Sequence, residues 1–263
     1  MRRIPLLILA LFIIHFCTAQ TILNRIEKSG ELRVGTSGTQ PPFSMESTTG
    51  ELMGYEIEIA TRLAQEMGVK LTTVRIPFAE LLPALEKGKV DIVFSNVTIT
   101  TDRNMKIAFK GPHMISGKSI LTKEITLRTV TNPQEINNSA IKIAVLQNST
   151  SEIYAREKTP VAKITPVANY DLALEMIKTG EVDLLLADYA ICAYSVLLNP
   201  NEGFYTLGSP LSIEPVGVAM PAGDPLFLNL VENYIMNLEL SGYLKQLQDK
   251  WFTSGDWLDQ VKK

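Results

Sequence analysis

The strongest constraint on the fold is a pattern that occurs twice in the chain. Residues 84–96 read as the end of a helix, a glycine and then a continuous apolar run, and residues 176–188 repeat this order. A glycine is the residue at which helices commonly end. An apolar run without polar alternation is typical of a strand buried on both faces, as in a parallel sheet. The first run ends in Ser95 and Asn96, and the second ends in Asp188.

A second pair of strands is predicted upstream of these runs. Residues 32–38 and 141–150 each read as a strand that leads into a small, polar loop. Between the strands, apolar residues recur at helical spacing over 59–67, and Asp171 is placed to cap the corresponding helix of the second half. Strands that alternate with helices indicate an α/β fold. Two similar α/β units indicate two lobes.

The first twenty residues have the three parts of a secretory signal peptide. Two arginines precede an apolar run over 4–14, and small residues follow over 17–19. The run is shorter than the roughly 20 residues that a membrane-spanning helix needs. We therefore expect residues 1–19 to be a cleaved signal peptide. Lipidation of Cys17 is the alternative, and the bulky Phe16 before it disfavours that processing.

The composition excludes several classes of protein. The chain has 25 basic and 28 acidic residues and a net charge of −3, so no basic excess is present to hold a nucleic-acid backbone. Beyond the signal peptide, His113 and Cys192 are the only histidine and the only cysteine. A two-histidine metal site and an internal disulfide are thereby excluded, and we expect no metal and no cofactor. Cys192 is expected to be a small, buried apolar residue.

Polar residues gather at the predicted strand ends, where open α/β sheets bind their ligands. Residues 95–98 lead into a short helix start that contains Arg103, and residues 148–150 form the matching loop of the second half. An arginine with hydroxyls and backbone N–H groups suits a carboxylate. Asp188, at the equivalent strand end of the other half, suits an ammonium. Together these residues suit a zwitterionic ligand that is held between two lobes.

Each of these residues also has a plainer interpretation. Asp102 and Arg103 can form a solvated helix start, and Thr98 and Thr100 can be β-formers at a strand end. Asp188 can cap the helix that follows it. Residues from three segments in the two halves of the chain nevertheless suit the same type of ligand, a zwitterion. This agreement favours the binding interpretation.

The order of these motifs resembles the bacterial extracellular solute-binding proteins of family 3, the polar amino-acid receptors of ABC importers. The resemblance runs through nearly all of the chain after the signal peptide. It is carried by Leu32–Gly35 before Pro42-Phe43, by Gly54–Ala60, Val90–Val93, Thr98–Thr100 with Arg103, Val145–Gln147 and Asp183–Asp188, and by Gly242–Leu244 and Lys250–Phe252 near the end.

The resemblance implies a two-lobed, type II periplasmic-binding fold with the ligand in the cleft between the lobes. The first lobe would comprise residues 20–115 and 214–263, and the second lobe residues 116–213. Two strand-like crossings near Ser116 and Glu214 would join them. The protein would be a periplasmic monomer that delivers a free amino acid to an inner-membrane ABC permease.

The resemblance also implies roles for particular residues. Arg103 and Thr98 would hold the α-carboxylate with help from Asn96 and Thr150, and Asp188 would hold the α-ammonium with help from Ser95. Phe78 matches an aromatic wall for the ligand side chain, or else packs into the core. With the strand-end loop included, the expected ligand-binding set is Gln40, Phe78, Ser95, Asn96, Thr98, Arg103, Ser149, Thr150 and Asp188.

Two departures from the family pattern bear on the choice of ligand. Gln40 stands where many members carry an aromatic lid, and Ser37 stands where cation-selective members carry an acid. With no second charge visible in the pocket, we expect a neutral amino acid, because an unpaired buried charge costs several kcal/mol.

Two other functions compete with an import receptor. Cyclohexadienyl dehydratases resemble amino-acid binders over their length and carry a catalytic glutamate three residues after the aspartate that matches Asp188. Here that position is Ile191, which cannot transfer a proton, so we expect no enzyme. A ligand-binding sensor subunit is the other alternative.

Overall fold

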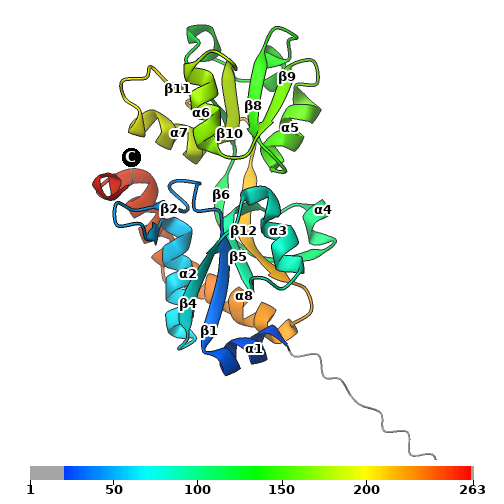
Figure 1. Cartoon of the computed structure of the whole chain (residues 1–263), viewed down its shortest axis with the longest axis vertical. Coiled ribbons are helices and arrows are strands. Elements are labelled where there is room, and N and C mark those ends of the chain that lie inside the picture. The colour runs from blue at the N-terminus through cyan, green and yellow to red at the C-terminus, as the bar shows by residue number, and fades with distance from the viewer. Residues whose placement is uncertain (1–20, 262–263) are drawn as a thin grey trace, which may run out of the picture.

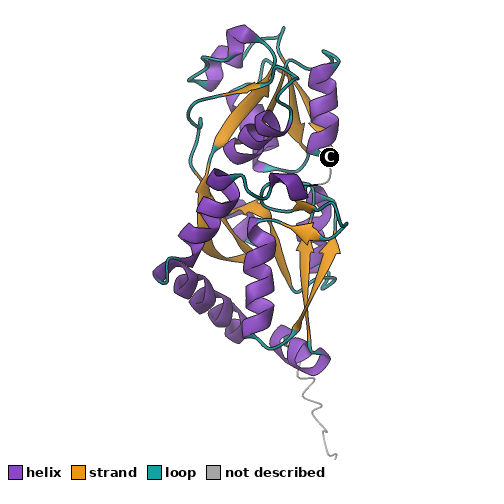
Figure 2. Ribbon diagram, turned by 90° about the vertical axis from the view of Figure 1, so that its left-hand side faces the viewer, coloured by secondary structure: helices purple, strands orange, loops and turns teal. Residues whose placement is uncertain are grey.

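A computed structural model describes residues 21–261; the expected signal peptide and Cys17 lie outside the described residues. Figures 1 and 2 show two lobes arranged end to end, each built on its own sheet and flanked by helices. The strand order is β4-β1-β5-β12-β6 in the first lobe and β11-β7-β10-β8-β9 in the second. The two-lobed α/β fold expected from the sequence is confirmed.

The first lobe contains both ends of the described chain. Its sheet consists of β1 (Glu31–Thr36), β4 (Lys70–Arg75), β5 (Ile92–Thr98), β6 (Ile107–Ser116) and β12 (Glu214–Pro221), beside a small hairpin of β2 (Met45–Glu46) and β3 (Leu52–Met53). Its helices are α1 (Ile22–Ser29), α2 (Tyr55–Glu66), α3 (Phe78–Glu86), α4 (Thr101–Asn104), α8 (Pro225–Leu240) and α9 (Tyr243–Asp249), followed by short turns η3 (Lys250–Ser254) and η4 (Leu258–Gln260).

The second lobe is one continuous stretch of the chain. Its sheet consists of β7 (Lys118–Thr122), β8 (Lys142–Leu146), β9 (Lys163–Val167), β10 (Leu184–Asp188) and β11 (Tyr205–Thr206). Its helices are α5 (Thr150–Lys158), α6 (Tyr170–Lys178) and α7 (Tyr189–Leu198), with short 3₁₀ turns η1 (Ile125–Leu127) and η2 (Pro133–Ile136).

The two repeated apolar runs form the corresponding strands β5 and β10. Each run follows a glycine in the left-handed conformation, Gly88 at φ 66° and Gly180 at φ 75°, where a side chain would be strained. Each strand pairs in parallel with the first strand of its unit, β5 with β1 and β10 with β8, and in antiparallel with a strand on its other side, β12 or β7. The prediction of parallel pairing therefore holds on one side of each strand.

The two lobes are linked where β6 and β12 run side by side (Figure 1). Ser116 at the end of β6 pairs with Glu214 at the start of β12. Gly117 allows the two chains to approach closely, because a Cβ atom there would lie 2.0 Å from the carbonyl oxygen of Ser212. The polar strand ends of both sheets thus meet beside this link.

Burial of the apolar strands and helix faces forms the cores. Cys192 is fully buried in α7, as predicted. The expected cap of α6 is wrong: Asn169, not Asp171, is the N-cap, and its side chain accepts a hydrogen bond from the backbone N–H of Leu172 at 2.9 Å. Within residues 21–261, no helix combines the length and apolar character needed to cross a membrane.

Candidate functional site

The strand ends of the two lobes enclose a small polar pocket. The space within it is only about 10 Å³, close to the least that one water molecule requires (~10–15 Å³). The polar side chains of the two lobes therefore touch one another directly. The pocket is lined by Gln40, Phe78, Asn96, Lys118, Leu146, Ser149, Thr150, Ser151, Tyr170 and Asp188.

Asp188 lies at the centre of this contact. It ends β10 and precedes α7, yet its side chain makes no capping hydrogen bond to that helix. The Oδ2 atom accepts a hydrogen bond from Asn96 Nδ2 of the opposite lobe at 2.6 Å, and Oδ1 lies 2.6 Å from Lys118 Nζ. The carboxylate thus faces the cleft, and the plainer interpretation as a helix cap does not hold for its side chain.

Lys118 is the site residue that sequence reasoning missed. Its side chain is 1% exposed, and its Nζ atom donates to Thr150 Oγ1 at 2.8 Å and lies 3.2 Å from Glu214 Oε2 as well as beside Asp188. The expectation that the pocket holds no second charge is therefore wrong. The signal was a lysine at the start of the otherwise uncharged strand β7, which pairs Lys118 with Asp188 in the antiparallel register.

A buried polar layer beneath Asn96 holds it in place. Asn96 has φ 51°, an uncommon conformation for a residue with a side chain. Its backbone N–H donates to Glu56 Oε2 at 2.7 Å, and Glu56 Oε1 lies 3.2 Å from His113 Nε2. Glu56 and His113 are completely buried side chains. Backbone strain of this kind clusters at functional sites, and Asn148 on the opposite lobe has the same left-handed conformation (φ 56°).

Arg103 joins the two lobes at the edge of the pocket. Its Nη1 atom donates to the carbonyl oxygen of Thr98 at 2.8 Å, and Nη2 reaches that of Asn148 at 3.5 Å. Burial lowers the pKa of the guanidinium, while the nearby carboxylates of Glu214 and Asp188 oppose this effect. Arg103 is not one of the residues that line the enclosed space, so the guanidinium stands beside it.

The threonines predicted to hold a carboxylate are brought together across the cleft. Thr98 Oγ1 of the first lobe lies 3.1 Å from Thr150 Oγ1 of the second. Ser95 is not brought to Asp188: its hydroxyl donates to Ser37 Oγ at 3.2 Å. The hydroxyl of Ser149 lines the pocket but caps α5. The structure therefore does not bring Ser95 to Asp188, and its role beside the ammonium stays a prediction.

Phe78 and Gln40 lie where the resemblance placed them, on the pocket wall. Phe78 begins α3 and is partly buried, and it also packs against two apolar clusters, one within the first lobe and one that includes residues of both lobes, so the two interpretations of its role are compatible. The Gln40 side chain is buried, at 1% exposure for the residue, and neither its Nε2 nor its Oε1 atom has a hydrogen-bond partner. The structure thus holds an amide at this wall with its hydrogen-bonding capacity unused.

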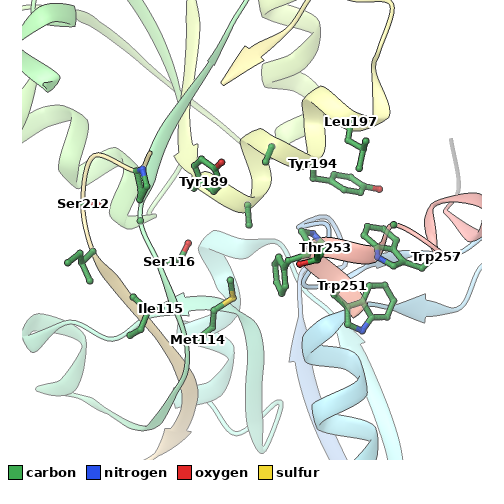
Figure 3. A pocket seen from close by; sticks show the side chains of 18 residues that line it. Met114, Ile115, Ser116, Tyr189, Tyr194, Leu197, Ser212, Trp251, Thr253 and Trp257 are labelled. Carbon is green, nitrogen blue, oxygen red and sulfur yellow. The ribbon is translucent and has the colours of Figure 1, made fainter. Parts of the chain in front are cut away.

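Two larger cavities also lie between the lobes. One, of about 630 Å³, adjoins the polar pocket at Tyr170 and is bordered by Ser37 and Ile191. The other, of about 470 Å³, lies beside the link between the lobes, where Trp257 faces Tyr194 of α7 (Figure 3). No charged side chain lines this second cavity. It therefore lacks the groups that a zwitterion requires.

The described part of the chain contains no group of three or more histidine, cysteine, aspartate or glutamate residues arranged to hold a metal ion.

Comparisons with known proteins agree with this architecture. Residues 32–254 match the family model of the bacterial extracellular solute-binding proteins, family 3. The L-cystine-binding protein TcyJ of Escherichia coli (strain K12) is 28% identical over 88% of this chain and 86% of its own length. The cyclohexadienyl dehydratase of Pseudomonas aeruginosa is 27% identical over 87% of this chain and 85% of its own.

A solved structure extends the comparison to the fold. The crystal structure of the ancestral amino acid-binding protein AncCDT-1, described as a precursor of cyclohexadienyl dehydratase, has a TM-score of 0.82 and 34% identity, and the match covers 89% of this chain and all of that one. Together with the two-lobed fold and the polar cleft, these matches show that the chain belongs to the bacterial extracellular solute-binding proteins, family 3.

Proposed function

We propose that this protein is a periplasmic receptor that captures a neutral amino acid between its lobes and delivers it to an inner-membrane ABC permease. The observation that carries the proposal is the placement of Arg103 and Asp188 at facing strand ends of the two lobes, joined across the cleft through Asn96 and Thr98. The family and its relatives, which include cystine-, glutamine- and arginine-binding proteins, support an amino acid as the ligand, and its neutral charge rests on the charges of the pocket.

The carboxylate pole is formed by Arg103 with the two threonine hydroxyls. A planar guanidinium recognises a carboxylate through two parallel N–H donors. Thr98 and Thr150 meet directly at 3.1 Å, so a carboxylate inserted between them would receive a hydroxyl donor from each lobe. Such a ligand would replace a weak neutral contact by charge-assisted hydrogen bonds to both lobes.

The ammonium pole is formed by Asp188. An ionised carboxylate has about four lone-pair sites, and Asp188 uses two of them for Asn96 and Lys118. Glu214 balances the charge of Lys118, which leaves the charge of Asp188 for the ligand. Arg103 then balances the ligand carboxylate. The filled site is neutral only when the ligand side chain carries no charge.

We further propose that no reaction occurs in the cleft. Ile191, at the position of the dehydratase acid in the resemblance, is a buried apolar side chain. His113 is fully buried beneath the pocket beside Glu56, out of reach of a ligand. Lys118 is held between two carboxylates. Incubation with prephenate and arogenate should therefore give no phenylpyruvate or phenylalanine above the uncatalysed rate, and turnover that a cleft substitution abolishes would make the protein an enzyme.

Entry of a ligand requires the lobes to move apart, because the enclosed space of about 10 Å³ is too small for an amino acid. The proposed hinge lies at the crossings near Ser116 and Glu214, with lobe boundaries at 116 and 214; these boundaries stay a prediction. Small-angle scattering should show a more compact protein with ligand than without it. Identical profiles at saturating ligand would contradict a hinge.

A thermal-shift screen over the common amino acids tests the receptor function. A ligand at about a thousand times its Kd stabilises the folded state by about 4 kcal/mol, so at least one neutral amino acid should raise the melting temperature by several degrees. No shift with any amino acid would contradict the proposal. Ligand uptake into vesicles that contain the permease would separate an import receptor from a sensor subunit.

A further inference from the structure

Two buried groups of the pocket bear on the side chain of the ligand, the amide of Gln40 and the ammonium of Lys118. Both residues line the same enclosed space and both are 1% exposed. Gln40 has a donor and an acceptor without partners. Buried polar groups are almost always hydrogen-bonded, so each such group is a reason to look for the partner that satisfies it.

Gln40 distinguishes ligands by the polarity of their side chains. The backbone of Gln40 is held by reciprocal hydrogen bonds with Ser44, at 2.8 and 3.0 Å, so the residue is fixed in place while its amide stays unsatisfied. An apolar ligand side chain would keep both amide atoms buried and unpaired. A carboxamide side chain can accept from Nε2 and donate to Oε1 at once, and a hydroxyl can satisfy either atom.

Lys118 distinguishes ligands by charge. Its ammonium is shared between Asp188 at 2.6 Å and Glu214 at 3.2 Å. A cationic ligand side chain within the polar pocket would add a positive charge beside Lys118, where Ser37 provides no carboxylate; Asp171 and Glu175 line the adjoining cavity and not this pocket. An acidic side chain would add an unbalanced negative charge, because Lys118 already serves two carboxylates. Both cases place an uncompensated charge in a site of low solvent access, which is unfavourable.

We propose that the ligand is an amino acid with an uncharged, hydrogen-bonding side chain, best a carboxamide, and that Gln40 and Lys118 select it. This inference rests on the proposed function, since it assumes that the main-chain groups of the ligand bind Arg103 and Asp188. It goes further by naming the side-chain class and the two residues that decide it.

The test is a calorimetric comparison of four ligands of similar size: glutamine, leucine, lysine and glutamate. The wild-type protein should bind glutamine about tenfold or more tightly than each of the others, because each of the others leaves buried groups unpaired or a charge unbalanced. Equal affinity for glutamine and leucine, with both above lysine and glutamate, would overturn the inference and keep the proposed function. Equal affinity for all four would overturn the inference and also the neutral ligand of the proposed function. Binding of no amino acid would overturn both.

Three variants assign the selection to particular residues. In Gln40→Leu, leucine and glutamine should bind with affinities within about threefold of each other. In Lys118→Met, the affinity for lysine should rise about tenfold relative to that for glutamine, because a positive charge has been removed from the pocket. In Glu214→Gln, the affinity for glutamate should rise by a similar factor, because a negative charge has been removed. The Glu214 variant keeps the Lys118–Asp188 pair and so remains informative if Lys118→Met does not fold.

Lys123→Met is the matched control. Lys123 lies one strand length beyond Lys118, is 38% exposed and pairs with Glu202 at 3.8 Å, outside the pocket. The Lys123→Met variant should leave the affinities for all four ligands unchanged. Unchanged ligand ratios in Gln40→Leu and Glu214→Gln would show that neither the amide nor the charge balance selects the ligand, and would overturn the inference.

Discussion

The two lobes present matching strand ends with different chemistry. In the first lobe, β5 ends in the neutral Asn96 and Thr98, and Arg103 of the following helix α4 donates to backbone carbonyl oxygens. In the second lobe, β10 ends in Asp188, which is already bound to the buried Lys118. The two strand ends therefore share a backbone plan and differ in charge: the first lobe presents the cation of Arg103, and the second presents the carboxylate of Asp188 beside the buried Lys118.

This difference predicts that the second lobe is more sensitive in stability. Lys118→Met would remove the cation that contacts both the buried Asp188 and the partly buried Glu214, and removing one partner of a buried ion pair costs roughly 3–5 kcal/mol. Denaturant unfolding without ligand should show a loss of this size. Lys123→Met should change the free energy of unfolding by less than about 0.5 kcal/mol. A loss below about 1 kcal/mol for Lys118→Met would remove the asymmetry between the lobes.

Arg103→Ala should show the opposite pattern: the affinity for the ligand should fall strongly, and the free energy of unfolding should change little. The guanidinium is the proposed carboxylate pole, so the Kd should rise by about a hundredfold or more. Isothermal titration with the best ligand measures this. Arg156→Ala is the control, because Arg156 is 56% exposed and pairs with Glu152 of its own helix. Near-native affinity in Arg103→Ala would contradict the assignment.

Asn96→Gly isolates the contact that joins the two strand ends. Glycine accepts the left-handed backbone of Asn96 (φ 51°) without strain, so the substitution removes the hydrogen bond to Asp188 and little else. A hydrogen bond to a charged group contributes about 1.5–3 kcal/mol, and we expect affinity to fall about tenfold. Asn148→Gly, on the opposite lobe, is the matched backbone control. Equal affinities for the two variants would show that the Asn96 side chain is dispensable.

The smallest expected effect concerns the aromatic contact at the far side of the cleft. Tyr194 of α7 stacks on Trp257 of the first lobe, with ring centroids 5.4 Å apart and planes 11° from parallel. Such pairs contribute about 0.5–1.5 kcal/mol beyond their buried area, so Tyr194→Leu should weaken ligand binding by about twofold to tenfold. Stopped-flow tryptophan fluorescence should place the loss in a faster release of ligand. An unchanged release rate would exclude this contact from the closed state.

The sequence predicted the fold because its signals are local. A glycine after a helix and an apolar run buried on both faces are short-range patterns, and they placed β5, β10 and their polar ends correctly. Asp188 and Arg103 could be singled out for the same reason, because strand ends are where ligands bind in α/β sheets.

From the sequence, one contact was missed and two side chains were misplaced. Lys118 meets Asp188 only through the antiparallel register of β7 and β10, which no local pattern reveals. Ser95 was expected at the ammonium pole, but its side chain turns to Ser37 on the neighbouring loop. The cap of α6 was misplaced by two residues because Asn169 and Asp171 are both good capping types.

A crystal structure of the protein with glutamine bound would show which residues hold each group of the ligand. We predict the α-carboxylate between Arg103 and the threonine pair, the α-ammonium on Asp188, Lys118 turned toward Glu214, and the ligand amide on Gln40. A ligand in the apolar cavity beside Trp257, or one in the cleft with its carboxylate at Lys118 and its ammonium away from Asp188, would contradict this prediction.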